Sequence, residues 1–77
     1  MVVKMINNKI TATKINNLML EFGAKLDNTV NFVKKECNQS DFDAYKKGVG
    51  KIMGTMLLEI MNPIYKEHPD LKPKELN

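Results

Sequence analysis

Apolar residues recur at helical spacing in two long stretches of the 77-residue chain, and a short polar stretch separates them. In the first stretch, intervals of three and four residues gather the apolar side chains within roughly 120° of the circumference of a helix. The pattern therefore predicts an amphipathic helix over residues 13–37 that packs along one side. Its expected apolar face consists of Ile15, Leu18, Met19, Phe22, Leu26, Val30, Val33 and Cys37.

The second stretch, residues 41–66, is apolar around more of its surface. Its main face and a neighbouring second group together cover roughly 240° of a helix. A single antiparallel neighbour cannot shield that much apolar surface, so the pattern predicts a further partner. The main face consists of Phe42, Tyr45, Val49, Ile52, Met53, Met56, Leu57, Ile60 and Ile64, and the second group of Gly50, Gly54, Leu58 and Met61.

The polar connection is short, with Ser40 placed as the N-cap of the second helix. A link of about three residues favours an antiparallel helical hairpin. A chain of this length buries only a small core, and such domains are usually stabilised by disulfides, metals or oligomerisation. The single cysteine cannot form a disulfide within the chain, and one cysteine with one histidine is too few for a structural metal site, so oligomerisation is the remaining means of stabilisation. We therefore expect an all-α hairpin that dimerises into a four-helix bundle.

Both ends of the chain are expected to differ from the hairpin. Residues 1–12 fit either an arm or a short helix, with threonines available as caps for the following helix. Pro63 is expected to kink the second helix, and residues 67–77 to form an exposed proline-rich arm. All of these elements belong to a single predicted domain, residues 1–77.

Two glycines one turn apart, Gly50 and Gly54, are the most distinctive local feature. Glycine costs about 1 kcal/mol relative to alanine inside a helix, so the pair predicts a close approach of another backbone. That backbone belongs either to the first helix or to a second copy of the chain. The residues expected at this close packing or dimer contact are Gly50, Gly54, Leu57, Leu58 and Met61.

The net charge of +3 comes from twelve lysines, no arginine and nine interleaved acids. Five lysines near the connection are expected to form a basic patch, but Phe42 and Tyr45 are expected to point into the core rather than to stack on bases. Binding to a nucleic-acid backbone through phosphate contacts alone is therefore the alternative function. The patch consists of Lys34, Lys35, Lys46, Lys47 and Lys51.

The inventory of reactive side chains argues against catalysis. Ser40 is the only serine, His68 lies in the expected exposed arm, and Cys37 is expected to be a buried, inert thiol. No Gly-rich phosphate loop follows a strand, and no Cys/His cluster is available for a metal. The sequence predicts no enzyme, no cofactor and no metal. No segment resembles a signal peptide or a membrane span of about 20 apolar residues, so the cytoplasm is the expected location.

A glycine-containing helix leads into Asn62-Pro63-Ile64-Tyr65 and then into His68-Pro69-Asp70-Leu71-Lys72-Pro73. This half of the chain resembles short helical bacterial proteins of uncharacterised function. The resemblance implies that the proline-rich segment is a built feature, and it supplies no activity or binding residues. The function class expected from the residues is a non-enzymatic homodimeric interaction or structural protein.

Overall fold

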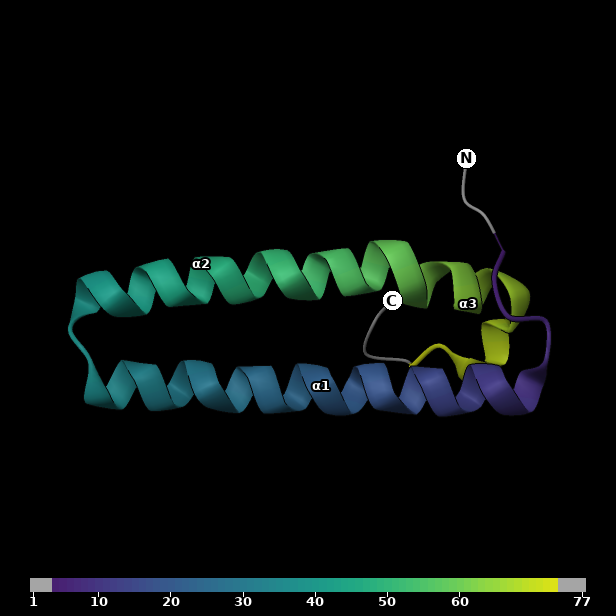
Figure 1. Cartoon of the computed structure of the whole chain (residues 1–77), viewed down its shortest axis with the longest axis horizontal. Helices are drawn as coiled ribbons and strands as arrows, with labels where there is room; N and C mark the ends of the chain where they lie inside the picture. Colours follow the sequence, from purple (N-terminus) through teal and green to yellow (C-terminus); the bar gives the residue numbers. More distant parts are fainter. Residues whose placement is uncertain (1–3, 74–77) are drawn as a thin grey trace.

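The computed structural model describes residues 4–73, which form two long antiparallel helices joined by a short turn (Figure 1). Helix α1 spans Lys9–Glu36 and helix α2 spans Gln39–Met56. The chain continues through a π-helical turn, η1 (Leu57–Met61), into α3 (Asn62–Glu67), and a 3₁₀ turn, η2 (Pro69–Leu71), follows. No strand occurs in this part of the chain, and the predicted all-α hairpin is confirmed.

Both long helices begin at asparagine caps, Asn8 and Asn38, that were not predicted from the sequence. The Asn8 side chain accepts a hydrogen bond from the Thr11 backbone N–H at 2.9 Å, so α1 begins four residues before the expected Thr13. The Asn38 side chain likewise accepts from the backbone N–H of Asp41 at 2.8 Å, and Ser40 lies in the first turn of α2. The prediction of Ser40 as the cap is wrong, because the equally good cap two residues earlier is used.

Before Pro63, where a kink is expected, the helix widens into a π-helical turn. Proline has no amide hydrogen and cannot complete the α-helical bond to the carbonyl four residues earlier. The turn from Leu57 to Met61 is π-helical, and the backbone N–H of Asn62 donates to the carbonyl of Leu57, five residues back. Such π turns are a common way to insert an irregularity into a continuing helix. Helical backbone therefore continues past Pro63 to Glu67.

The most buried core lies at the open end of the hairpin, away from the connecting turn. There α1 meets η1 and α3, and half-buried residues from the N-terminal arm and Leu71 complete the packing. Ile64 has no exposed surface, and neither has Ala12. The buried members of this core are Ala12, Met19, Met61, Ile64 and Tyr65. The chain therefore encloses its core with its terminal segments as well as with its two long helices.

A buried polar pair joins α3 to α1 within this core. The Tyr65 hydroxyl donates to Asn16 Oδ1 at 2.5 Å, and the Asn16 amide donates to the Leu71 carbonyl at 3.4 Å. Asn16 is only 4% exposed, so its amide has little access to water. Buried polar groups are costly unless they are paired, and these bonds pair them.

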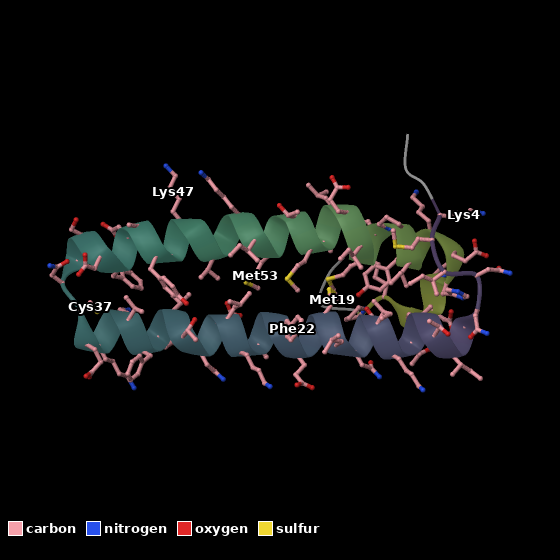
Figure 2. The ribbon with its side chains drawn as sticks, viewed as in Figure 1. Lys4, Met19, Phe22, Cys37, Lys47 and Met53 are labelled. Atoms are coloured by element: carbon pink, nitrogen blue, oxygen red, sulfur yellow. The ribbon has the colours of Figure 1, made fainter. Side chains whose placement is uncertain are left out.

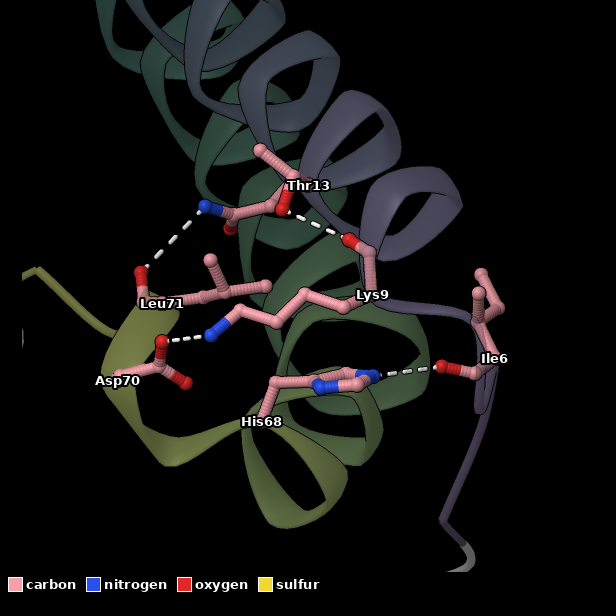
Figure 3. Close-up of polar contacts among 7 residues, drawn as sticks. Ile6, Lys9, Thr13, His68, Asp70 and Leu71 are labelled. Carbon is pink, nitrogen blue, oxygen red and sulfur yellow. Dashed lines mark hydrogen bonds and ion pairs between the residues drawn. The ribbon is translucent and has the colours of Figure 1, made fainter.

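The segment after α3 folds back on α1 instead of extending into solvent (Figure 3). His68 is buried, and its Nε2 hydrogen bonds with the carbonyl oxygen of Ile6 at 2.9 Å. Lys9 forms an ion pair with Asp70 on the surface. The prediction of an exposed position is therefore wrong for His68, which is buried, and for half-buried Leu71, whereas Pro69 and Asp70 between them are exposed. Residues 74–77 lie outside the described part of the chain. We call the contacts of His68, Asp70 and Leu71 with residues 6–16 the clasp.

The N-terminal partner of the clasp has an unusual backbone. Ile6 has a φ of 60°, in the left-handed region that β-branched residues rarely occupy. Its carbonyl is held by His68, and its side chain packs against the core. These contacts offset a conformational cost of about 1–3 kcal/mol, which is typical of such backbone strain.

Tyr65→Phe tests the buried polar pair. Removing the hydroxyl leaves Asn16 without its buried donor, and we expect unfolding in urea to become easier by about 1–3 kcal/mol. Tyr45→Phe is the matched control, because the Tyr45 hydroxyl also makes one hydrogen bond, to Thr29, but at an exposed position. The control should change stability by less than about 0.5 kcal/mol. Equal losses in the two variants would contradict the role of the buried pair.

Because of Tyr65, the stability of the fold is expected to depend on pH in the alkaline range. Burial raises the pKa of Tyr65 above its ordinary value of 10.0. The folded chain thus holds the hydroxyl proton more tightly than the unfolded chain does. The contribution of this hydroxyl to the free energy of unfolding is therefore complete below pH 10.0 and is lost as the pH rises through the raised pKa. Between about pH 8 and about pH 11, the free energy of unfolding measured in urea should fall more steeply for the wild type than for Tyr65→Phe. If this free energy falls equally with pH in the two proteins, the buried hydroxyl makes no such contribution.

Candidate interaction surface

The two helices form a single layer, so each has a partner on one side only along its middle (Figure 1). The molecule measures 44 × 24 × 19 Å, and its two broad faces both carry apolar grooves along the seam between α1 and α2. We name these the glycine face and the phenylalanine face. They are the candidate sites, because binding surfaces in small proteins are typically apolar and exposed.

The glycine face holds the larger groove, about 460 Å³ in volume. Its floor and walls are almost entirely apolar, with Asp27 as the one charged residue. Figure 2 shows Met19 and Met53 directed into the space between the two helices. The α1 side contributes Met19, Leu20, Gly23, Ala24 and Asp27, and the α2 and η1 side contributes Met53, Gly54, Met56, Leu57 and Met61.

The phenylalanine face holds a smaller groove, about 300 Å³ in volume. Bulky side chains occupy it: Phe22 is 44% exposed and Ile52 is 53% exposed. Both residues were expected on the apolar faces, yet neither is covered by the other helix. The groove is lined by Phe22, Lys25, Leu26, Thr29, Ile52 and Met56.

The predicted close packing at Gly50 and Gly54 does not occur within the chain. A Cβ atom built at either glycine meets no atom of another part of the chain within 4 Å. The intrachain form of the prediction is therefore wrong at both positions, because these glycines face outward beside the seam. Contact with a second copy remains a prediction. Leu57 and Met61 line the groove of the glycine face, and Leu58 is 66% exposed in η1, on the side away from α1.

The glycine that does contact the facing helix is Gly23, which the sequence reading passed over. A Cβ atom there would lie 3.6 Å from Cε of Met53. A lone glycine in the interior of a predicted helix was the available signal, because its cost of about 1 kcal/mol calls for an explanation. Asn16 gave no comparable signal, since its partner Tyr65 lies 49 residues away in the chain.

The lysines of the predicted basic patch are all exposed. Lys34 and Lys46 both approach the ring of half-buried Phe42, with their Nζ atoms 5.9 and 5.8 Å from its centroid. Lys47 points away from α1 (Figure 2). A ring already covered by two ammonium groups is not free to stack on bases. Nucleic-acid binding remains a prediction that this arrangement does not strengthen.

The candidate reactive groups are far apart. Cys37 is exposed at the turn, and the prediction of a buried thiol is wrong because α1 ends at Glu36 and the extended backbone of Cys37 takes its side chain off the helical stripe. His68 lies at the other end of the hairpin, in the clasp. Within residues 4–73, no three His, Cys, Asp or Glu side chains come together as a metal site. No helix in the same range has the length and hydropathy needed to cross a bilayer.

The candidate surface is thus an apolar seam with a groove on each side, framed by a core and clasp at one end and a turn at the other. Such a surface has the chemistry for packing against another apolar surface. Comparisons with protein families, with curated proteins and with solved structures found no match to this chain.

Proposed function

We propose that this protein is a non-enzymatic homodimer, in which two hairpins pack face to face as a four-helix bundle and serve an interaction or structural role. The observation that carries the proposal is the exposure of large apolar side chains in the middle of both helices. Leu20 on the glycine face is 38% exposed, and Phe22 and Ile52 on the phenylalanine face are 44% and 53% exposed. Side chains of this size each contribute about 1.5–3 kcal/mol when fully buried, so covering one of these faces favours association.

The surface area supports the same proposal. The chain exposes 5801 Å², whereas a compact monomer of 8.8 kDa is expected to expose about 4,800 Å². The excess, about 1,000 Å², is similar to the area of about 800 Å² that each partner buries in an interface of standard size. The radius of gyration, 14.6 Å, likewise exceeds the value of about 11.5 Å expected for a compact domain of this length.

A non-catalytic role is supported by how the reactive groups are used. The ring of His68 holds the N-terminal segment through the Ile6 carbonyl, and Cys37 lies at the opposite end of the hairpin. We further propose the cytoplasm as the location, because an exposed lone thiol is typical of a reducing compartment.

Light scattering tests the homodimer. At about 100 μM chain we expect a molar mass of twice 8.8 kDa, and we expect the midpoint of thermal unfolding to fall on dilution because association stabilises the folded state. A mass of 8.8 kDa and a midpoint that does not change with concentration would contradict the proposal. A mass well above twice that value would show that the assembly is not a dimer.

A further inference from the structure

We infer that the second copy docks on the glycine face rather than the phenylalanine face, with its connecting turn at the same end as the turn of the first copy. The inference deepens the proposed homodimer and rests on it. It assigns one groove of the hairpin, and one orientation of the partner, to the interface.

The shape of the glycine face favours a close helical partner. Its groove is the larger of the two and is bordered by Gly54 on one helix and by Ala24 on the other. Small residues on both borders let a second pair of helices approach to the 8–10 Å at which helix axes pack. On the phenylalanine face, Phe22 and Ile52 project from both helices and Lys25 adds a charge, which keeps a second backbone farther away.

Apolar side chains surround the small residues and supply the area to be buried. Leu20, which is 38% exposed, and half-buried Leu57 line the groove on its two sides, and Met53 forms its floor with Gly23. Removing apolar surface from water contributes about 25 cal/mol per Å², so a partner seated here gains from the walls while the glycines permit its approach. The apolar walls, the volume of the groove and the small residues at its borders together favour the glycine face as the docking site.

The hairpin itself fixes which residues lie level with one another along its length. Gly23 lies level with Met53, Thr29 with Tyr45, and Lys34 with Phe42, as their contacts show. A two-fold axis parallel to the helices keeps every residue at its own level and lays α1 of one copy against α2 of the other. Across the interface, each residue of α1 then meets the same level of α2 as it does within its own chain.

Charges on the glycine face match in this orientation. At about 100° per residue, Asp27 on α1 falls on the glycine side of the seam, and Lys47 on α2 lies at the outer border of the same face, directed away from α1 of its own chain (Figure 2). Lys35 at the outer border of α1 and Asp43 on α2 form a second such pair near the turn. The members of each pair lie within one helical turn of the same level, so each lysine can reach the aspartate of the second copy, and symmetry repeats both pairs. With the turns at opposite ends, α1 would lie on α1, and both matches would be lost.

Gly54→Leu and Gly48→Leu separate the two faces. Both glycines lie in α2, and a Cβ at either meets no other part of the chain within 4 Å. Leucine also favours helix more than glycine does, so neither change should unfold the hairpin. Gly48 falls on the side of α2 that carries Ile52, at about 100° per residue. We expect Gly54→Leu to raise the dimer dissociation constant at least about tenfold, and Gly48→Leu to change it less than about twofold.

Ala24→Leu, on the α1 border of the same groove, is the second variant and should weaken the dimer as Gly54→Leu does. Circular dichroism verifies that each variant is helical before sedimentation measures its dissociation constant. A dimer weakened by Gly48→Leu, or unaffected by both Gly54→Leu and Ala24→Leu, would overturn the choice of face. A wild-type chain that is monomeric throughout would instead overturn the proposed homodimer.

Cys37 supplies the test of orientation, because it is free, exposed and adjacent to the turn. A nitroxide attached to it in the full chain should give a distance between the two labels below about 30 Å, since helices in one bundle lie about 10 Å apart. Turns at opposite ends would separate the labels by the length of α1, 28 residues or about 42 Å. A distance of that length in a protein that is dimeric would overturn the orientation and leave the homodimer intact.

Discussion

The constraint on which this structure depends is that a hairpin of two helices is only one layer thick. Each helix can cover one side of its neighbour, and α2 carries apolar residues on more than one side. Within residues 4–73, Val49 of α2 is buried, but Ile52 on the same helix and Leu58 in η1 remain largely exposed. A second layer of helices on one broad face would cover part of the apolar surface that the intrachain packing leaves exposed.

The open end and the middle of the hairpin differ in how their apolar side chains are covered. At the open end, the chain covers its core with its own terminal segments: α3 and η2 fold back on α1, and the clasp joins them to the N-terminal arm. Along the middle no such segment is present among the described residues. The apolar middle is thus the part of the molecule that we propose a second copy covers, while the open end has its own buried core.

The periodicity of apolar residues was sufficient to predict two helices and the excess apolar surface of the second, and the short polar connection was sufficient to predict their antiparallel arrangement, because both are local features of the sequence. Local patterns could not predict contacts between residues that are far apart in the chain. Nothing near Asn16 or His68 in the sequence indicates that Tyr65 and Ile6 are their partners. The glycines show the same limit, since spacing marked Gly50 and Gly54 but could not say that they face outward while Gly23 faces Met53.

Small-angle X-ray scattering tests most directly whether a second hairpin covers the apolar middle side by side with the first. We expect a scattering mass of twice 8.8 kDa together with a longest dimension that stays close to the 44 Å of one hairpin. A particle with the mass of one chain, or one of double mass whose length approaches twice that of a hairpin, would contradict it.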